Sequence, residues 1–548
     1  MRDSVAQLSK DYWEWRAWQQ PRSGDDLPRL VRPVEWIPKW SAEDISKYRN
    51  QNLVFLARLN AIEVGTYESP NVSREAWVDH QLMGSAISRV TWELDYVQFW
   101  KNHPRFYVDQ TIGAVFDYLL PLNVDSRTFE NIERLLKEFP RILEEGKENL
   151  AGNCIKEFNE VTIVELLDIQ NQMAIMSREL ISSFPDIYAD ELLGLAEFAA
   201  LALDEFRNWL ITELPNCLPF VPLGAEKFTW FLSEVALIPL TPEQLFTIGE
   251  IELNRAIFLE AVHKNRYKEV LLPALPKSAI EQSQTEADLE AEVSKFYVSQ
   301  GLLSQETRFK RYLNAPRPRY LEPIRWLGVT DDLTSPDRLD QNGVAYVPEP
   351  KPDMPYFYAA NARDPRAGIA HEGAHYQQLV RSWSNPREIR RHYYDSGVNE
   401  GIAFYNEELL LGAGLFANAP HSQTLHYNFM KLRAMRVCVD VSLVTGKMTI
   451  ESATRYLSEK IPMDLATASE EAIFFAGFPG QGLTYQIGKT QIQKLFADLV
   501  MTKGEKFDFQ EFHDYLWENG NVPISLLRFE LLGDFSDLNH LHKSKEEK

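Results

Sequence analysis

The 548-residue sequence predicts a mainly α fold with a small strand-containing subdomain. Long segments repeat apolar side chains every three or four residues, which gathers them on one face of a helix. One proline- and aromatic-rich segment, residues 314–368, interrupts this pattern. The chain is 45% hydrophobic and 25% charged, a composition typical of globular proteins. Its length predicts one large domain or two to three ordinary ones.

The clearest helices are identified by periodicity and by capping residues. Phe129–Leu150 and Ala189–Leu214 place apolar side chains on one face and charges on the other. A further helix is expected to begin after Thr241, because Thr241 as N-cap, Pro242 at the first helical position and Gln244 form a capping box. These signals predict structure and carry no information about chemistry.

Two segments depart from the helical pattern. The polar segment Pro273–Glu290 predicts a surface loop or a short exposed helix. In Asn314–Gly368, the pieces VAYVP (Val344–Pro348) and PYFYAAN (Pro355–Asn361) predict short strands between prolines, since aromatic and β-branched residues favour strands.

The expected domain organisation follows from these segments. Residues 1–104 are expected to form an N-terminal helical segment. Residues 105–548 are expected to form one helical domain that carries the functional site, with a small strand-containing insert around residues 314–368.

Charge and cysteine content exclude several classes of partner. The formal net charge of −22 argues against nucleic acid and anionic membranes, because phosphate groups would be repelled. Cys154, Cys217 and Cys438 are too far apart in sequence for a CxxC metal knuckle or a disulfide framework. The chain has no signal-like N-terminus and no apolar run of about 18 residues. We therefore expect a cytoplasmic protein that acts on a small molecule.

The stretch AHEGAHYQQLV (Ala370–Val380) contains the arrangement HExxH. On a helix, His371 and His375 lie on one face with Cβ atoms about 5–6 Å apart, so both imidazoles can bind one zinc ion. Glu372 then lies near the open side of the metal and can accept a proton from the attacking water. The alternative is a pair of surface histidines beside a solvated acid, since three fixed positions recur by chance in long chains.

A third metal ligand is available in the next predicted helix. Asp395 and Ser396 are good N-cap residues, and Glu400 follows them, 25 residues after His375. Glu400 would complete a site of two histidines and one glutamate with a position open to water, which suits zinc better than manganese or iron. Alternatively, Glu400 is simply an acid placed favourably at a helix N-terminus. Glu407, on the same helix face, could support the site or be the ligand instead.

Four blocks of the sequence resemble domain-of-unknown-function family 885, helical proteins related to gluzincin-type metallopeptidases. They are PLGAEKF (Pro222–Phe228), NEGIAFYNEEL (Asn399–Leu409), FPGQGLTYQIGK (Phe478–Lys489) and the C-terminal block Gly504–Leu527. The resemblance spans about Val108 to Leu527. It implies a large helical fold with a deep cleft, and it matches Glu400 to the family's third ligand.

The sequence also departs from this family. HEGAH has the plain four-residue spacing, where relatives usually carry a Pro-Gly insertion. Val444 stands where the family's Asp-x-Gly-x-His element has a histidine, and Ile402 replaces a tryptophan. If the missing histidine polarises the substrate in relatives, this chain lacks that group.

Several other polar residues have a candidate functional role and a structural alternative. Tyr485 is the candidate oxyanion stabiliser, or else a buried tyrosine with a structural hydrogen bond. A substrate carboxylate could bind one of three cations, which could equally pair with acids: Lys489, Arg433 and Arg436. His513 is expected to be a packed core histidine.

Together these residues predict a zinc-dependent hydrolase that cleaves an amide bond in a short peptide or an amino-acid conjugate. One alternative is a metalloenzyme of the same fold that acts on a non-peptide small molecule in a biosynthetic pathway. Another is an inactive helical binding protein that has kept the motif.

Overall fold

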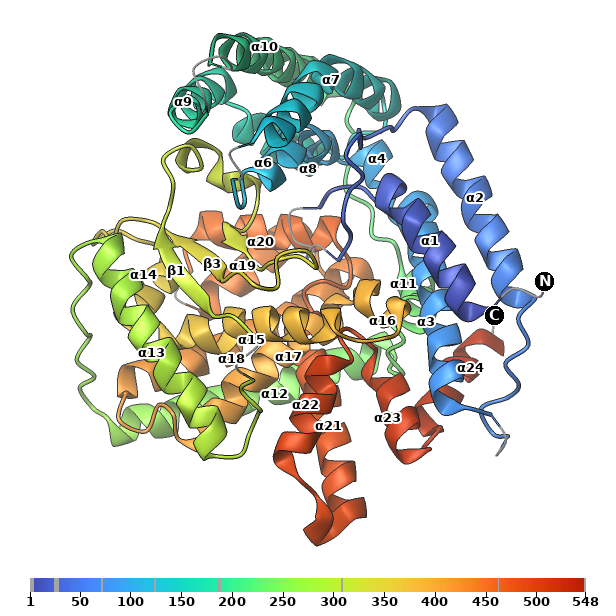
Figure 1. Cartoon of the computed structure of the whole chain (residues 1–548), viewed down its shortest axis with the longest axis vertical. Coiled ribbons are helices and arrows are strands. Elements are labelled where there is room, and N and C mark those ends of the chain that lie inside the picture. Colours follow the sequence, from blue (N-terminus) through green and yellow to red (C-terminus); the bar gives the residue numbers. More distant parts are fainter. Residues whose placement is uncertain are drawn as a thin grey trace.

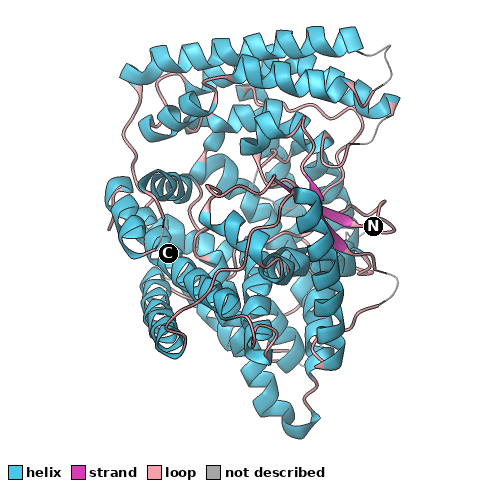
Figure 2. Ribbon diagram, turned by 90° about the vertical axis from the view of Figure 1, so that its left-hand side faces the viewer, coloured by secondary structure: helices cyan, strands magenta, loops and turns pink. Residues whose placement is uncertain are grey.

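The computed structural model describes residues 4–23, 29–69, 72–122, 125–184, 189–306, 309–461 and 463–546. In these ranges the chain forms a large helical body with one small sheet at its side (Figure 1; Figure 2). The prediction of a mainly α fold with a small β-containing part is confirmed. Among the described helices, none combines the length and apolar character needed to cross a membrane.

Long amphipathic helices form a layer at the top of Figure 1. Helices α7 (Ser126–Leu150) and α10 (Ala189–Glu213) confirm the two periodic segments and pack against each other, and α10 also packs against α9 (Ile169–Ile181). The Asp125 carboxylate caps α7 by accepting a hydrogen bond from the Thr128 amide at 2.7 Å. The remaining elements before residue 240 are α1 (Val5–Gln19), α2 (Ala42–Asn60), α3 (Arg74–Thr91), the π-helical turn η1 (Trp92–Val97), α4 (Phe99–Asn102), α5 (Arg105–Val108), the π-helical turn η2 (Asp109–Gly113), α6 (Ala114–Tyr118), α8 (Lys156–Glu165), the 3₁₀ turn η4 (Leu214–Asn216) and α11 (Ala225–Glu234).

One hydrophobic cluster joins the two ends of the chain. Trp77 and Leu82 of α3 belong to the same core as Trp517 and Phe529 near the C-terminus. The rings of Trp77 and Phe529 lie 5.2 Å apart in an edge-on arrangement. Residues on both sides of residue 104 therefore share a core, and the division at this position stays a prediction.

The centre of the molecule is built from long helices that begin at clear capping signals. Helix α12 (Pro242–Arg266) has the predicted capping box, since the Gln244 amide donates to Thr241 Oγ1 and the Thr241 amide donates to Gln244 Oε1. It packs along α18 (Pro420–Val444). The other helices of the second half are α13 (Ala279–Ser299), the 3₁₀ turn η5 (Glu322–Leu327), α14 (Tyr356–Arg363), α15 (Arg366–Trp383), α16 (Glu388–His392), α17 (Ser396–Ala413), α19 (Ile450–Lys460), α20 (Leu465–Gly477), α21 (Thr484–Lys503), the 3₁₀ turn η6 (Gly504–Lys506), α22 (Phe509–Glu518), α23 (Ile524–Leu532) and α24 (Ser536–Glu546).

The sheet has three short strands, β1 (Tyr312–Pro316), β2 (Asp331–Asp332) and β3 (Gly343–Val347). Their order is β1-β3-β2, with β3 parallel to β1 and antiparallel to β2. Strand β3 confirms the strand expected at VAYVP. Tyr312 of β1 packs against Tyr376 of α15, so the sheet lies directly on the helix that carries the HExxH sequence.

Two local predictions were wrong. PYFYAAN is not a strand but the first part of helix α14, because Pro355 occupies the N-cap position and helix-favouring alanines follow the aromatic residues. The segment Pro273–Glu290 contains the start of the 21-residue helix α13 and not a short helix. Its signal is Ser278 followed three residues later by Glu281, whose amide the serine hydroxyl caps at 3.2 Å.

Candidate metal centre

The two histidines of the HExxH sequence lie inside the protein. Helix α15 is covered by the sheet on one side and by α17 on another, so its residues Ala370, Ala374 and Leu379 are buried. The side chains of His371 and His375 are only 13% and 5% exposed. Their rings are 5.0 Å apart and nearly perpendicular. The alternative of two surface histidines is therefore wrong.

Glu400 of α17 reaches both imidazoles. Its Oε2 atom lies 3.4 Å from His371 Nε2 and 3.5 Å from His375 Nε2. One ligand atom from each of the three residues falls within 4.8 Å of the other two. Ligand atoms held about 2.0–2.2 Å from one tetrahedral zinc ion lie roughly 3.3–3.6 Å apart. The spacing of Glu400 from the two imidazoles therefore fits a shared metal ion.

The hydrogen bonding of the cluster also fits a cation. Glu400 Oε2 is buried and has no hydrogen-bond partner among the described residues. A buried acceptor left without a partner is destabilising, and a metal ion would satisfy it. Burial opposes ionisation of Glu400, but the imidazoles of His375 and His371 outweigh it and hold the pKa of the carboxyl well below its usual range. The donor set of two imidazoles and one carboxylate suits zinc.

Glu407 supports the cluster from behind and is not placed as a ligand. Its Oε1 atom lies 2.6 Å from His371 Nδ1, on the side of the ring away from Glu400. Its Oε2 atom accepts a hydrogen bond from Arg433 at 2.7 Å, and His426 Nδ1 lies 3.5 Å from the same oxygen. A carboxylate bound to Nδ1–H fixes the imidazole tautomer that leaves the Nε2 lone pair free for a metal. His426 therefore belongs to this network as well.

The acids around His371 make its position favourable for positive charge. Burial lowers the pKa of His371, but the negative charge of Glu372 and the nearby carboxylates of Glu400 and Glu407 outweigh burial and raise it to about 10. The pKa of Glu407 is held well below its usual range despite burial, chiefly by the charge of Arg433. The same surroundings attract a divalent cation.

Glycine residues bring helix α21 against α17. A Cβ atom on Gly401 would lie 2.6 Å from the Cα atom of Gly488, and one on Gly488 would lie 1.8 Å from the Gly397 carbonyl oxygen. Only glycines allow the two backbones to approach this closely. The contact brings Tyr485, in the first turn of α21, beside His371, with the two rings 6.1 Å apart and nearly parallel.

The loop before α21 is held by a buried carboxylate. Asp440 of α18 accepts hydrogen bonds from the amides of Gly480 at 2.9 Å and Leu483 at 3.0 Å. Burial raises the pKa of Asp440 to about 7, and the backbone hydrogen bonds oppose this shift. Gly480 has a φ of +94°, and a Cβ atom there would lie 2.5 Å from Phe231. The glycine-rich block thus forms the expected tight turn, and Asp440 fixes its position.

Val444 does not contribute to the candidate centre. It lies at the end of α18, where it packs with Phe228 and Val441 in an apolar cluster. It is not among the residues that line the cavity at the metal cluster. The side chain that stands in place of the family's histidine is therefore part of the core.

A cavity of about 560 Å³ opens beside the cluster. His371, Glu372, Glu407 and Tyr485 line it on the helical side, so Glu372 faces the space in which a substrate would lie. Residues of the sheet, which packs on α15, line another part of the cavity. This cavity is the deep cleft that the family resemblance implied.

The remaining polar residues named in the sequence analysis contact other side chains or the backbone. Arg433 and Arg436 line the cavity, where both guanidinium groups lie over the ring of Tyr485, at 5.1 and 5.3 Å from its centroid. Each also pairs with an acid, Arg433 with Glu407 and Arg436 with Glu471, as the structural alternative predicted. Lys489 is fully buried and pairs with Glu408 at 2.7 Å, which makes it structural. His513 is the packed core histidine predicted, donating from Nδ1 to the Leu302 carbonyl and accepting from the Tyr405 hydroxyl at Nε2.

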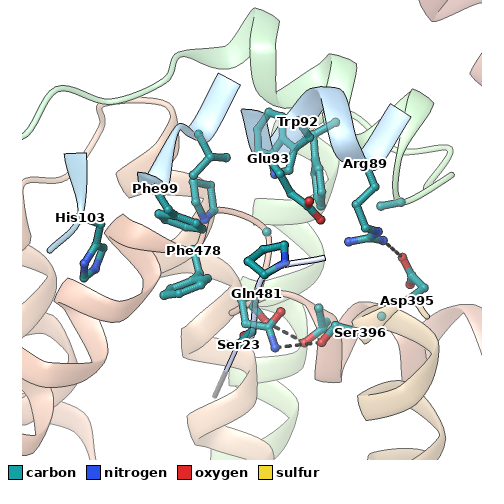
Figure 3. Close-up of a pocket in the computed structure, with 18 of the residues that line it drawn as sticks. Ser23, Arg89, Trp92, Glu93, Phe99, His103, Asp395, Ser396, Phe478 and Gln481 are labelled. Carbon is teal, nitrogen blue, oxygen red and sulfur yellow. Dashed lines mark hydrogen bonds and ion pairs between the residues drawn. The ribbon is translucent and has the colours of Figure 1, made fainter. Parts of the chain in front are cut away.

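A second cavity, of about 160 Å³, is lined by the loop before α21 and by the start of α17. Figure 3 shows Trp92, Phe99 and Phe478 on its walls, with the rings of Phe99 and Phe478 4.5 Å apart. The ion pair between Arg89 and Asp395 closes one end (Figure 3). It shares no lining residue with the cavity at the metal cluster.

The fold and the candidate site define a large helical protein with a cluster of two histidines and one glutamate at an internal cavity. The chain belongs to the DUF885 family, described as bacterial protein of unknown function, whose model matches residues 34–531.

Two solved structures of similar proteins share this fold. A candidate lipoprotein of unknown function from Shewanella oneidensis is 16% identical, with a TM-score of 0.71, and the match covers 97% of this chain and 100% of that chain. A candidate lipoprotein from Colwellia psychrerythraea is 15% identical, with a TM-score of 0.72, and the match covers 100% of both chains. At these identities the likeness establishes the fold alone. A comparison with curated proteins finds no match.

Proposed function

We propose that this protein is a zinc-dependent hydrolase that cleaves an amide bond in a short peptide or an amino-acid conjugate. The observation that carries this proposal is the convergence of His371, His375 and Glu400, with a buried Glu400 oxygen that no described residue satisfies. The support that Glu407 gives to His371 is a further feature of zinc sites. A relation of the family to gluzincin-type metallopeptidases, inferred from the motif blocks, agrees with this function.

Each residue has a role that follows from its position. His371, His375 and Glu400 would hold the ion, and a bound zinc ion would supply Lewis acidity that activates water and polarises a carbonyl. Glu372 accepts a proton from the attacking water as the new C–O bond forms. The phenol of Tyr485 donates a hydrogen bond to the oxyanion that develops on the carbonyl oxygen. Glu372 then passes its proton to the nitrogen that leaves as the C–N bond breaks.

The cavity supports a small substrate. Its volume of about 560 Å³ suits a short peptide or a conjugate of similar size, since small-molecule sites typically span about 300–1,000 Å³. The non-peptide alternative was favoured by the valine at position 444. That residue packs in the core away from the cavity, so its identity does not discriminate between the two substrate classes.

The proposed partner is therefore a small molecule in solution. The net charge of −22 supports this and disfavours nucleic acid. The cytoplasmic location stays a prediction. Two proteins of similar structure are described as candidate lipoproteins, a description that applies to those proteins.

Metal quantification combined with a peptide-cleavage screen tests the function. The wild-type protein is expected to contain one zinc ion per chain and to cleave members of a panel of dipeptides and tripeptides. Glu400→Ala should lose the metal. Glu372→Gln should keep the metal and lose cleavage, whereas Glu292→Gln, an exposed glutamate on α13, should change neither. Tyr485→Phe should keep the metal and lower kcat by about 10²–10³-fold.

Two outcomes would contradict the proposal. Absence of stoichiometric metal from the folded wild-type protein would remove the basis of the catalytic site. Cleavage that survives Glu372→Gln would remove the general base. A metal-loaded protein that cleaves no peptide in the panel would favour the non-peptide alternative.

A further inference from the structure

One face of the small sheet forms a wall of the cavity beside the metal cluster. Asn314 of β1, Ala345 of β3 and Asp331 of β2 are register partners in one row across the sheet. All three line the cavity, as does Tyr312, which lies two residues before Asn314 on the same face of β1. Because Ala345 has only a methyl side chain, the row is lowest at its centre. The sheet thus presents a notch between two polar side chains.

The carboxylate at one side of this notch is not paired with a cation. Among the described residues, no arginine, lysine or histidine forms an ion pair with Asp331. Its neighbour Asp332, which points to the other face of the strand, is held by two hydrogen bonds from Arg338 at 2.9 and 2.7 Å. Burial and the negative charge of Glu372 raise the pKa of Asp331 to about 8. Two acids therefore approach each other at the cavity without a compensating charge.

Two further polar groups of the same wall lack partners. Tyr312 is only 5% exposed, yet its hydroxyl has no hydrogen-bond partner among the described residues. Its ring stacks on that of Tyr376 at 5.8 Å, and this packing holds the hydroxyl close to Asp331. The side-chain nitrogen of Asn314 is likewise buried without a partner. Each buried polar group left unpaired is destabilising by about 1–3 kcal/mol. A ligand in the cavity would relieve this.

The charges around the notch select the sign of that ligand. Asp331, Glu372 and the buried Glu286 all line this part of the cavity, so a cationic group placed there would be attracted and would favour the ionised form of Asp331. The guanidinium groups of Arg433 and Arg436, on α18, also line the cavity, but each is paired with an acid, Glu407 or Glu471. A molecule with a positive end toward the sheet therefore matches the charge distribution of the cavity.

We propose that the sheet wall binds the free ammonium group of the substrate, with Asp331 as its ion-pair partner and the Tyr312 hydroxyl oxygen as a hydrogen-bond acceptor. This inference rests on the proposed function, because it takes the substrate to be a short peptide. The class of substrate is then a peptide with an unblocked N-terminus, held so that its first amide bond lies near Glu372. Asp331 is a specificity-determining residue, since acetylation of the amine would remove its partner.

Binding measurements without turnover test the inference. Each dipeptide of a panel Xaa-Ala, free or N-acetylated, is titrated by calorimetry into zinc-loaded protein that carries Glu372→Gln. The free peptides are expected to bind at least tenfold more tightly than their acetylated forms. Adding Asp331→Asn should abolish this preference, and Ala345→Leu, which fills the notch with an apolar side chain, should do the same. Asp340→Asn makes the same charge change at an exposed position of the same subdomain and should leave the preference intact.

Equal affinities for free and acetylated peptides, or a preference that survives Asp331→Asn, would overturn the inference, as would failure of every free dipeptide to bind. Turnover of the same peptides by the wild-type protein distinguishes failure of the ammonium subsite from failure of the proposed hydrolase function. Asp331-dependent binding without any cleavage would leave the subsite standing and refute the hydrolase. Equal cleavage of free and acetylated peptides would support the hydrolase and refute the ammonium subsite.

Discussion

A methyl group added at Gly488 tests whether the contact between α17 and α21 positions the candidate metal centre. The new Cβ atom would lie 1.8 Å from the Gly397 carbonyl oxygen. A carbon atom approaches an oxygen no closer than about 3.3 Å without repulsion, so the helices must separate by about 1.5 Å, the difference between these distances. The obstacle is helix backbone, which cannot rotate away as a side chain would.

The expected loss of stability follows from this overlap. Overpacking a core by one methyl group typically destabilises a protein by about 1–3 kcal/mol, and a clash with backbone belongs at the upper end of that range. Gly488→Ala should therefore lower the free energy of unfolding by about 3 kcal/mol. Metal sites tolerate displacements of only about 0.2 Å in ligand distance. Movement of α17 would carry Glu400 out of reach, so the affinity for zinc should fall as well.

Urea denaturation and a competition assay with a zinc chelator measure the two effects. Gly412→Ala is the matched control, because this glycine lies on α17, the helix that Gly488 contacts, and a Cβ atom there meets no other group within 4 Å. The control should leave zinc affinity unchanged and should stabilise the fold by up to about 1 kcal/mol. If Gly488→Ala behaves like Gly412→Ala, the close contact does not position the site and the reasoning is refuted.

Two other perturbations have defined outcomes. Glu407→Gln should weaken zinc binding by about 10–100-fold, because the amide accepts a weaker hydrogen bond from His371 Nδ1–H than the carboxylate does. Unchanged zinc affinity in the chelator assay would contradict the supporting role of Glu407. Burial lowers the pKa of His513 to about 4, against about 6.5 in an unfolded chain, so the folded state binds fewer protons than the unfolded state between these values. The free energy of unfolding should therefore fall by up to about 3 kcal/mol as the pH falls from 6.5 to 4. In His513→Gln this dependence should be weaker by that amount when urea denaturation is repeated across the range, and an unchanged slope would show that another group is responsible.

Local interactions explain which parts of the fold were predictable. Helices α7, α10 and α12 follow from apolar periodicity and from caps such as Thr241 with Gln244, which act within one turn of the chain. The start of α13 carried the same kind of signal at Ser278 and Glu281, and it was overlooked because the segment is polar. The strand predicted at α14 rested on the three aromatic residues at its start, which favour strands. The alanines that follow them favour a helix, and they outweigh the aromatic residues in the structure.

The candidate site divides in the same way. The placement of His371 and His375 on one helix face follows from a four-residue spacing, and Glu400 could be selected because its helix starts at a recognisable cap. The sequence could not assign the role of Glu407, because Glu400 and Glu407 lie on the same helix face. The two roles differ in which imidazole nitrogen the carboxylate contacts, and Glu407 contacts Nδ1 of His371. Asp440 lies four residues before Val444, at the first position of the family's Asp-x-Gly-x-His element. Its hydrogen bonds to the loop before α21 could not be predicted, because they join residues 40 and 43 positions apart.

The sequence by itself determined the helical class, several of the long helices and His371, His375 and Glu400 as candidate ligands, because periodicity, capping and a four-residue spacing are properties of neighbouring residues. Only the tertiary structure decided that Gly397, Gly401 and Gly488 let two helices meet, and that Tyr312 and Asp331 face the cavity. A strand of two residues, such as β2, has no periodicity to detect. Which of its side chains points inward is decided by its pairing with a strand more than ten residues away.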